Sequence, residues 1–330
     1  MSEVILELKN LKKYFPLPGG QSVKAVDGVS LKLFKGETLG LVGESGCGKS
    51  TIAYTVVGMY GATDGEIIYK GTTNLAKKGY KRNLQQKGEI QIVFQDPGSS
   101  LNSRRNVGKS LELPLKIHTK LNKEERQDRI DELLELVGLP IDFKKRMPRN
   151  IGGGERQLVS VARALGSDPE FIILDEPTSA LDVSVQAKVI STLIHLQEKL
   201  GLSYLFITHD LSLMRNVATR VAILYLGRLC ELAPTAEFFH RPLHPYTQML
   251  LSSIPVATDE EENIKPAQII SEGEIPSPVN VPSGCSFHTR CRDCMDICKV
   301  EVPVMIEIEP KHFVCCHKYQ QGEPLAVEVE

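Results

Sequence analysis

One segment of the sequence, Gly43-Glu44-Ser45-Gly46-Cys47-Gly48-Lys49-Ser50-Thr51, combines the residue types that bind phosphate groups. It lies between an apolar run, residues 38–42, and a run of helix-forming residues, 51–60. Its glycines let the backbone turn its N–H groups toward one point, and the following helix adds the positive end of its dipole there. Lys49 can reach terminal phosphates, and the Ser50 hydroxyl can ligate Mg²⁺. The pattern therefore predicts a phosphate-binding loop.

Two acidic residues follow another apolar run and suit the chemistry of phosphate transfer. Residues 171–174 are consecutively apolar, which is typical of a strand buried on both faces of a parallel sheet. Because open α/β sheets bind ligands at the carboxyl ends of their strands, we expect Asp175 near Mg²⁺ and Glu176 near an attacking water. The simpler alternative is a strand end that caps the next helix. His209 follows a further buried run, residues 204–207. A lone histidine is usually structural, but one at a third strand end of this sheet is more often functional and could sense the γ-phosphate.

Two other features fit a nucleotide. Gly152, Gly153 and Gly154 stand directly before a helical run, and glycines at a helix N-terminus form a second anion-binding element. Since one chain rarely needs two such elements on one phosphate group, this element is expected to serve a nucleotide held by another subunit. Tyr14 and Phe15 lie on a predicted loop, where an aromatic ring can stack on adenine or can belong to the core or an edge of the protein.

The elements that must position these residues are predicted from periodicity and turn residues. The early predicted strands are residues 3–11, 26–33, 65–69 and 89–94. Beyond Pro97 the pattern becomes helical, and Asn122 with Glu125 resembles a capping box at the start of a helix. Residues 98–150 are therefore predicted to form a helical insertion in an α/β domain.

Composition limits the classes of function. The chain of 330 residues has room for one large domain with an appendage or for two domains. Its 39 basic and 41 acidic residues nearly balance, so nothing in the charge points to nucleic acid or an acidic surface as the main partner. No apolar stretch approaches the ~18 residues that span a bilayer, and the first residues have no signal-peptide pattern. We therefore expect a cytosolic protein whose membrane contact is peripheral.

The cysteines crowd near the end of the chain. Six of the eight fall there: Cys285, Cys291, Cys294, Cys298, Cys315 and Cys316. In a reducing cytosol such crowding indicates metal before disulfides. The spacing of Cys291, Cys294 and Cys298 predicts a helical turn that brings the three thiols to one face. Thiolates at this density suit an iron–sulfur cluster or zinc, and free buried thiols are the remaining alternative.

In order and spacing, these features resemble the nucleotide-binding subunit of ABC transporters over residues 3 to about 235. The most discriminating feature is the triple-glycine segment upstream of the acidic strand, which kinases and GTPases lack. The resemblance implies an α/β fold: a P-loop NTPase core with a helical subdomain insertion, an antiparallel N-terminal β element and a small Cys-rich C-terminal extension. It also implies a head-to-tail dimer, in which each ATP lies between the phosphate loop of one subunit and the glycine-rich helix of the other.

The resemblance assigns roles to the residues that match the family's motifs. It implies that Ser50, Gln95 and Asp175 hold Mg²⁺. Glu176 would be the general base, His209 the switch histidine, and Gln95 a link to the coupling loop. Asp182 would belong to the turn between subunits. The implied nucleotide ligands are Phe15 or Tyr14 at adenine, and Gly43, Glu44, Ser45, Gly46, Cys47, Gly48, Lys49, Ser50, Thr51, Gly152, Gly153, Gly154 and Asp182.

The last part of the chain looks like the C-terminal extension of the oligopeptide/dipeptide permease class. The match rests on residues 244–247, 275–278 and 285–291. The resemblance divides the chain into an ATPase core, 1–97 and 151–235, a helical subdomain, 98–150, and this extension, 236–330. It also implies a [4Fe–4S] cluster, with Zn²⁺ as the alternative metal and Cys294 and Cys315 as additional thiols. The implied cluster ligands are Cys285, Cys291, Cys298 and Cys316.

Two positions depart from the family. Its signature reads Leu-Ser-Gly-Gly-Gln, whereas this chain has Gly152 at the serine position and Glu155 at the glutamine position. A hydroxyl donor to the γ-phosphate is lost, and a negative charge is added near it. A carboxylate at a helix N-terminus gains ~0.3–1 kcal/mol, yet it would compete with phosphate for the same field. The departure predicts a heterodimer in which the site completed by this signature is weak, unless the glycine amides suffice.

We therefore expect an ATP-hydrolysing subunit of an importer for di- or oligopeptides at the cytoplasmic face of the membrane. The expected partners are a paralogous ATP-binding subunit, two permease subunits and, indirectly, an extracytoplasmic solute-binding protein, with no nucleic acid. Oligosaccharide or nickel import is the alternative within the class. A soluble ABC mechanical ATPase of DNA repair or translation is the alternative from another class, but the chain has no long heptads and no basic arm. A kinase would leave the triple glycine unexplained.

Overall fold

The structure, a computed structural model, describes residues 3–254, 269 and 273–320. The chain forms two compact units. The first unit comprises Met1–Glu3, Phe34–Thr38 and Gly79–Ile207, and the second comprises Val4–Leu33, Leu39–Lys78 and Thr208–Glu330. The second unit thus holds both the phosphate loop and the described part of the C-terminal extension. The division into core, helical subdomain and extension stays an interpretation of the sequence, and residues 255–268, 270–272 and 321–330 of that extension lie outside the described residues.

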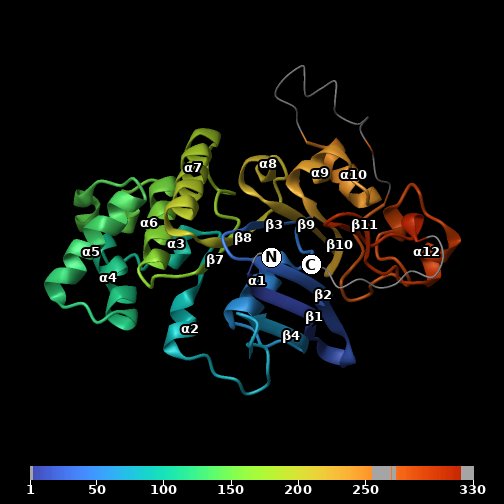
Figure 1. Ribbon diagram of the computed structural model, residues 1–330, viewed down its shortest axis with the longest axis horizontal. Helices are drawn as coiled ribbons and strands as arrows, with labels where there is room; N and C mark the ends of the chain where they lie inside the picture. Colours follow the sequence, from blue (N-terminus) through green and yellow to red (C-terminus); the bar gives the residue numbers. More distant parts are fainter. Residues whose placement is uncertain (1–2, 255–268, 270–272, 321–330) are drawn as a thin grey trace. The chain divides into compact units, whose positions relative to one another are not determined.

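An antiparallel sheet opens the second unit (Figure 1). Its strands are β1 (Val4–Pro16), β2 (Ser22–Phe34), β4 (Asp64–Tyr69) and β5 (Thr73–Asn74), in the order β2-β1-β4-β5. Leu6 lies opposite Tyr69 and Leu8 opposite Ile67, and all four side chains are buried. This sheet confirms the predicted antiparallel N-terminal element. The turn predicted between β1 and β2 contains the short helix η1 (Pro18–Gly20).

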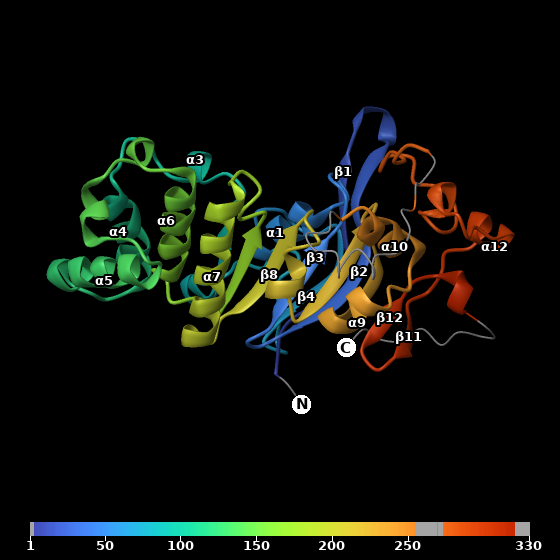
Figure 2. The ribbon, with the colours of Figure 1, turned by 90° about the horizontal axis from the view of Figure 1, so that it is seen from above.

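The second sheet of this unit joins distant parts of the chain. Its strands are β3 (Thr38–Val42), β9 (Arg220–Tyr225), β10 (Arg228–Pro234), β12 (His312–Val314) and β11 (Ile306–Glu309). β3 runs parallel to β9, and β10 then pairs antiparallel with both β9 and β12. The strands β11 and β12, from the last part of the chain, therefore extend the sheet that carries the phosphate loop (Figure 2).

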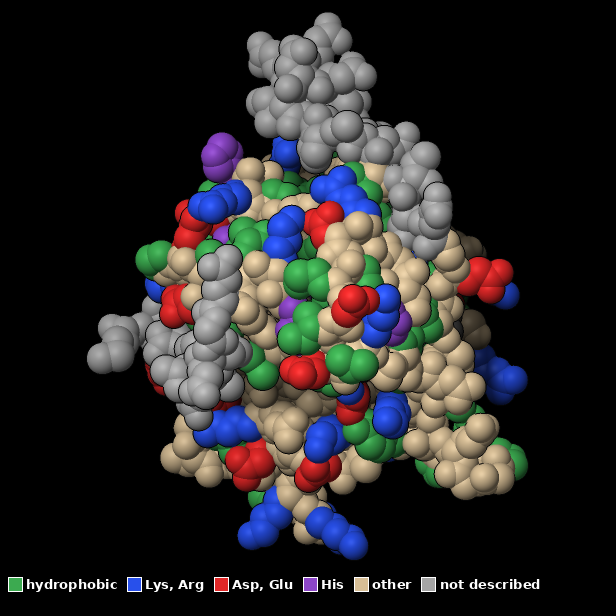
Figure 3. All heavy atoms as spheres, turned by 90° about the vertical axis from the view of Figure 1, so that its right-hand side faces the viewer, with side chains coloured by type: hydrophobic (Ala, Val, Ile, Leu, Met, Phe, Trp, Pro, Cys, Tyr) green, Lys and Arg blue, Asp and Glu red, His purple; other side chains and the backbone are tan. Residues whose placement is uncertain are grey.

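Short helices complete the second unit. They are α1 (Lys49–Val57), α8 (Met214–Val217), α9 (Thr235–His240), α10 (Pro245–Ser252), α12 (Asp296–Val300), η4 (His288–Arg290) and η5 (His317–Tyr319). The face that carries the C-terminal extension bears Lys and Arg side chains interspersed with Asp and Glu (Figure 3). The near balance of charge in the composition is thus also found on this face.

The first unit contains three parallel strands and most of the longer helices. The strands are β8 (Ser203–Thr208), β7 (Phe171–Asp175) and β6 (Ile90–Val93), in that order. Every residue of β7 is buried, as the apolar run predicts for a strand covered on both faces. The helices are α2 (Leu84–Glu89), α3 (Pro97–Ser100), α4 (Val107–His118), α5 (Lys123–Leu136), α6 (Gly153–Leu165) and α7 (Val183–Leu200), with η2 (Ile141–Lys145) and η3 (Pro148–Asn150).

The segment after Pro97 is helical, as predicted, and contains α4 and α5. Helices α4, α5 and α6 pack against one another (Figure 1). The Asn122 side chain accepts hydrogen bonds from the N–H groups of Glu124 and Glu125 at 2.8 and 3.1 Å, and the Glu125 carboxylate accepts the Asn122 N–H at 2.7 Å. This reciprocal capping box confirms the start of α5. Ile130 and Leu134 of α5 are fully buried.

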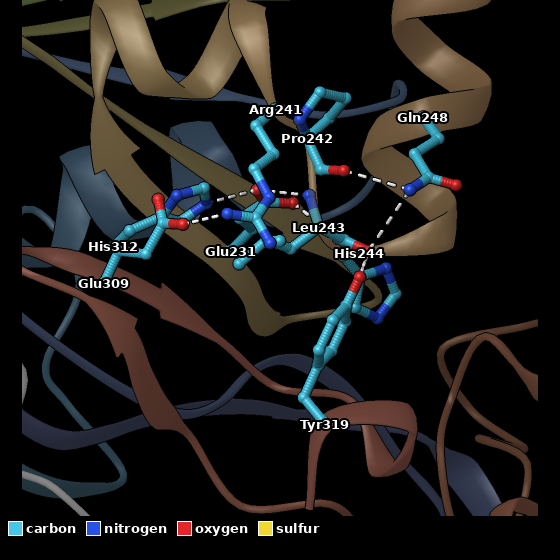
Figure 4. A network of polar contacts seen from close by, with 9 residues as sticks. All are labelled: Glu231, Arg241, Pro242, Leu243, His244, Gln248, Glu309, His312 and Tyr319. Carbon is cyan, nitrogen blue, oxygen red and sulfur yellow. Dashed lines mark hydrogen bonds and ion pairs between the residues drawn. The ribbon is translucent and has the colours of Figure 1, made fainter.

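A buried carboxylate connects β10 to the C-terminal extension (Figure 4). Glu231 on β10 is 0 % exposed and accepts the backbone N–H groups of Leu243 and His244 at 2.9 and 2.8 Å. His312 Nε2 on β12 donates to the same carboxylate at 2.8 Å. The Tyr319 hydroxyl donates to the Leu243 carbonyl at 3.0 Å. A charge without solvent needs such donors, so this carboxylate fixes three segments of the chain together.

His244 is buried in a neutral state. Its Nδ1 accepts the Tyr246 N–H at 3.0 Å and thereby caps α10. Burial disfavours the imidazolium and lowers the pKa of His244 to about 4. An unfolded histidine takes up a proton below about pH 6.5, whereas the folded protein resists protonation until about pH 4. The free energy of unfolding therefore falls as the pH drops through this window.

We predict that His244 alone lowers the free energy of unfolding by about 2 kcal/mol between pH 7 and pH 5. The variant His244→Asn keeps an acceptor at the cap but does not titrate, so its unfolding free energy should depend less on pH. Urea unfolding of both proteins at pH 7, 6 and 5 measures the difference. Parallel pH profiles would show that His244 is not the responsible group.

Candidate nucleotide-binding site

The predicted phosphate loop connects β3 to α1 in the second unit. Two of its glycines lie too close to neighbouring backbone to be replaced. A Cβ at Gly43 would lie 2.2 Å from the Leu224 carbonyl oxygen, and a Cβ at Gly48 would lie 2.1 Å from the Ala25 carbonyl oxygen. Gly48 also has a φ of +110°, which side chains rarely adopt. The loop therefore has the glycine-dependent backbone that the sequence pattern predicts.

Lys49 brings a buried ammonium to this loop. The residue is 5 % exposed, and its Nζ donates to the carbonyl oxygens of Gly43 and Glu44 at 2.7 and 3.0 Å. Lys49 is also the first residue of α1, whose first turn presents backbone N–H groups without intrahelical acceptors. Ammonium and helix N-terminus together suit an anion. Of the other predicted loop residues, Cys47 is buried, Ser50 and Thr51 are half-buried, and Ser45 and Gly46 are exposed.

The two candidate adenine-stacking residues lie on a strand, so the predicted loop position was wrong. β1 extends to Pro16, and the Tyr14 N–H donates to the side-chain hydroxyl of Thr63, just before β4, at 2.9 Å. The Thr63 side chain thus satisfies a backbone N–H that a loop would leave to solvent.

The two aromatic rings differ in their contacts. The Tyr14 hydroxyl donates to Asp27, which also accepts from Arg228 at 2.7 Å. Burial and this hydrogen bond raise the pKa of Tyr14 to about 12. The Phe15 ring instead meets the Tyr60 ring edge-on, with the centroids 5.3 Å apart. Because the Tyr14 hydroxyl is bound to Asp27, Phe15 is the better candidate for stacking.

The predicted acidic pair lies at the end of β7 in the first unit. Asp175 is 1 % exposed, and Glu176 has a φ of +45°, a conformation that costs energy for a residue with a side chain. The Glu176 N–H donates to the Ile207 carbonyl at 2.9 Å, and Gln95 Nε2 donates to the Glu176 carboxylate at 2.9 Å. The structure thus brings two predicted catalytic residues, Gln95 and Glu176, into direct contact. The strained backbone at Glu176 is held by hydrogen bonds and is typical of functional sites.

The triple glycine has two separate local roles. The Glu155 carboxylate accepts the Gly152 N–H at 2.6 Å at the start of α6. A Cβ at Gly154 would lie 2.1 Å from the Val185 side chain on α7, whereas a Cβ at Gly152 would meet the Glu155 carboxylate at 3.4 Å, an ordinary contact. Gly154 is therefore required for close helix packing, while position 152 has room for a side chain.

Asp182 and His209 belong to different units. Asp182 is the N-cap of α7, where it accepts the Val185 N–H at 3.0 Å and the Ser184 hydroxyl at 2.7 Å. These hydrogen bonds lower the pKa of Asp182. His209 is exposed directly after β8 and belongs to the second unit together with the phosphate loop. The described contacts give Asp182 a structural role in addition to the one that the resemblance implies.

The predicted helical face of three cysteines was wrong. Only Cys298 lies on α12, which begins at Asp296, and Cys291 and Cys294 precede it in a turn. The acidic side chain of Asp296 favours a helix start at this position, after the extended backbone of Met295. The predicted face required one continuous helix through all three cysteines, but the segment bends before α12.

Three of the four predicted cluster ligands are thiols with a raised pKa. Burial raises the pKa of Cys291 to about 12 and of Cys316 to about 11, and it also raises the pKa of Cys285. Neutral thiols are poor ligands until a metal displaces the proton. Within residues 3–254, 269 and 273–320, no group of three His, Cys, Asp or Glu side chains is placed to hold a metal. The cluster on Cys285, Cys291, Cys298 and Cys316 gains no support here and stays a prediction.

Two residues that reach the phosphate loop are not predicted from the sequence. Arg290 and Tyr246, both from the C-terminal extension, contact Glu44 in the loop. The sequence contains one weak signal for such a contact, because an acidic residue in a phosphate loop favours a cationic partner. It does not indicate which of many arginines supplies that partner. None of the described helices has the length and apolar character of a membrane span.

Two protein-family models match the sequence. The model of the ABC transporter family matches residues 26–179, and the model of the oligopeptide/dipeptide transporter C-terminal region matches residues 230–298. Solved ABC cassettes have a similar fold. The cassette MJ0796, solved as a dimer bound to ADP and Pi, superimposes with a TM-score of 0.64 at 28 % identity over 70 % of this chain and 99 % of its own. CbiO1 from Clostridium perfringens, part of an ABC transporter complex, gives 0.64 at 26 % identity over 72 % and 92 %.

The chain belongs to the ATP-binding proteins of ABC transporters. Within that class, relatives that match nearly the whole chain include peptide transport proteins. It is 48 % identical over 325 residues to the oligopeptide transport ATP-binding protein AppF of Bacillus subtilis, covering 96 % of this chain and 98 % of the relative. It is 43 % identical to OppF, the corresponding oligopeptide transport protein of Salmonella typhimurium, covering 96 % of each chain. It is 43 % identical to the dipeptide transport protein DppF of Haemophilus influenzae, covering 94 % of this chain and 96 % of the relative.

Proposed function

We propose that this protein is the ATP-hydrolysing subunit that energises an ABC importer of di- or oligopeptides. The observation that carries the proposal is similarity to oligopeptide and dipeptide transport ATP-binding proteins along nearly the whole chain. This similarity includes both the phosphate loop and the C-terminal extension. Import of an oligosaccharide or nickel is the alternative within the class, and a soluble mechanical ATPase lacks a comparable observation in its favour.

The residues that would hold ATP and Mg²⁺ have suitable chemistry. The phosphate loop offers backbone N–H groups and the Lys49 ammonium, which match the charge of a polyphosphate. Ser50, Gln95 and Asp175 offer hydroxyl, amide and carboxylate oxygens, the hard donors that Mg²⁺ prefers. When bound, Mg²⁺ neutralises charge that develops on the transferred phosphoryl group. Phe15 is the proposed contact of the adenine ring.

Glu176 is the proposed general base. Its carboxylate accepts a hydrogen bond from Gln95, and its backbone is held in a left-handed conformation by the bond to Ile207. A carboxylate fixed in this way can orient a water and take its proton as the water attacks phosphorus. His209 is the proposed contact of the γ-phosphate, and Asp182 is proposed to lie near the partner subunit.

The proposed partners follow from the class. A paralogous ATP-binding subunit would complete the nucleotide sites, as the dimeric state of the cassette MJ0796 suggests. Two permease subunits would hold the dimer at the cytoplasmic face of the membrane, and a solute-binding protein would deliver peptides from the other side.

We also propose that the C-terminal extension binds a [4Fe–4S] cluster or, alternatively, Zn²⁺. The support is the density of thiols and the resemblance of the segment to relatives that carry a cluster on four matching cysteines. The cluster would fold a segment too small to build its own core. Elemental analysis of the purified protein tests this proposal.

The ATPase proposal predicts different defects for two variants of the assembled transporter. Lys49→Ala should weaken ATP binding roughly 10–100-fold, because a charge-assisted contact of ~1.5–3 kcal/mol is lost. Glu176→Gln should bind ATP but lose turnover by roughly 100-fold or more, since a general base acts only in the chemical step. Nucleotide binding and phosphate release measure the two effects. Glu198→Gln, an exposed position on α7, is the matched control, and normal turnover in Glu176→Gln would exclude Glu176 as the base.

The unusual signature predicts an asymmetric dimer. In a complex with the paralogous subunit, Gly152→Ser with Glu155→Gln should raise nucleotide occupancy at the site that this signature completes, and with it the ATPase rate. The serine fits because position 152 has room, and glutamine can still accept the Gly152 N–H. Equilibrium nucleotide counting and the ATPase rate provide the measurements. If neither changes, the glycine amides suffice and the idea of a weakened site is wrong.

The cluster proposal predicts iron in anaerobically purified protein. The protein should be brown, absorb in the visible range and contain about four iron atoms per chain. Cys316→Ser should lose this iron, whereas Cys230→Ser, at a buried cysteine outside the predicted ligand set, should keep it. Zinc without iron would mean that the metal site exists but holds Zn²⁺ instead of the cluster. Colourless protein with neither metal would refute the proposal.

A further inference from the structure

Glu44 of the phosphate loop forms a two-point ion pair with the C-terminal extension. Arg290 Nη1 donates to Glu44 Oε2 at 2.8 Å, and Arg290 Nη2 donates to Glu44 Oε1 at 3.0 Å. The Arg290 side chain is 8 % exposed and that of Glu44 is 22 % exposed. A paired fork of this kind fixes the orientation of both side chains, and shielding from solvent strengthens it. The two residues are 246 positions apart in the sequence.

The backbone of Glu44 is fixed by the same extension. Its N–H donates to the Tyr246 hydroxyl at 3.0 Å, and Tyr246 is fully buried. The Tyr246 ring packs against Phe287 with the centroids 5.2 Å apart, and the Arg290 guanidinium lies 5.8 Å from the centroid of the Phe287 ring. Arg290 and Tyr246 therefore belong to one packed cluster, and this cluster holds both the main chain and the side chain of Glu44.

The position of Glu44 explains why it needs a cation. Its carbonyl oxygen accepts from Lys49 Nζ at 3.0 Å, so the residue directly neighbours the ammonium that would bind phosphate. A carboxylate released near that ammonium would compete with phosphate oxygens for it and would repel a polyanion. Arg290 both neutralises this carboxylate and holds it on the side of the extension. The phosphate loop alone thus contains a charge that opposes its own ligand.

We propose that Arg290 is a positioning residue of the nucleotide site, which keeps the Glu44 carboxylate from competing with ATP phosphates for Lys49. The proposal rests on the ATPase function proposed above. It makes the C-terminal extension a part of the nucleotide site in the same chain. Arg290 acts through Glu44 and not by touching the nucleotide, so its effect depends on the charge at position 44.

The test is a double-variant cycle on the full-length chain, with MgATP as the probe and calorimetry as the measurement. Arg290→Met keeps the apolar stem of the side chain and removes its charge. We expect it to raise the Kd for MgATP about tenfold, equivalent to ~1.4 kcal/mol. In a Glu44→Gln background, where no carboxylate needs to be held, the same Arg290→Met change should alter the Kd less than about twofold. Arg292→Met, two residues further along, should leave the Kd unchanged because Arg292 contacts Asp293 and Gln248 instead of the loop.

Each outcome decides the proposal. If Arg290→Met raises the Kd equally in both backgrounds, Arg290 only supports the fold and the proposal is overturned. The same holds if it changes the Kd in neither background. If the Arg290→Met protein does not fold, Arg290→Lys is measured in its place, because lysine keeps the charge but cannot form the two-point ion pair. The change in Kd that Arg290→Lys causes must again be absent in the Glu44→Gln background. Failure of the unaltered chain to bind MgATP would refute the ATPase function itself, which separates that failure from a failure of Arg290.

Discussion

The arrangement of the second unit depends on one buried carboxylate. Glu231 has no contact with solvent and is satisfied by donors from the start of α10 and from β12. Removing any donor would leave a buried charge partly unpaired, which costs several kcal/mol in typical proteins. The last strands of the chain are therefore held to β10 by an electrostatic requirement as well as by the hydrogen bonds of the sheet. This attachment places the extension beside the phosphate loop, where Tyr246 and Arg290 meet Glu44.

Local patterns in the sequence predicted the parts of the site that local chemistry determines. The phosphate loop, the buried strand before Asp175 and the capping box at Asn122 each require particular residues within a short segment. The structure places all three as expected, since close backbone contacts, burial on two faces and reciprocal hydrogen bonds leave few substitutes. The position of Glu176 at the end of a buried strand follows from the sequence. Its left-handed backbone conformation does not.

Contacts between distant segments could not be predicted in the same way. The pairing of β12 with β10 and the ion pair of Arg290 with Glu44 each join residues far apart in the sequence, and no periodicity encodes such partners. The helical face predicted for the cysteines was wrong for a different reason. A spacing that suits a helix is not sufficient when an acidic helix start, here Asp296, interrupts the segment. The loop position predicted for Tyr14 was wrong because β1 continues to Pro16 and the Thr63 hydroxyl binds the Tyr14 N–H.

The pairing of β10 with β12 also limits how far the chain could be shortened. A protein shortened to the nucleotide cassette would expose the outer edge of β10 as a row of unsatisfied N–H and C=O groups, with the Glu231 carboxylate beside it. Open edges of this kind template pairing with other chains and promote aggregation. In this protein, the peptide-transporter extension thus also serves as the edge protection of the ATPase sheet. Exchange of extensions between related cassettes would therefore have to preserve a matching strand as well as a matching function.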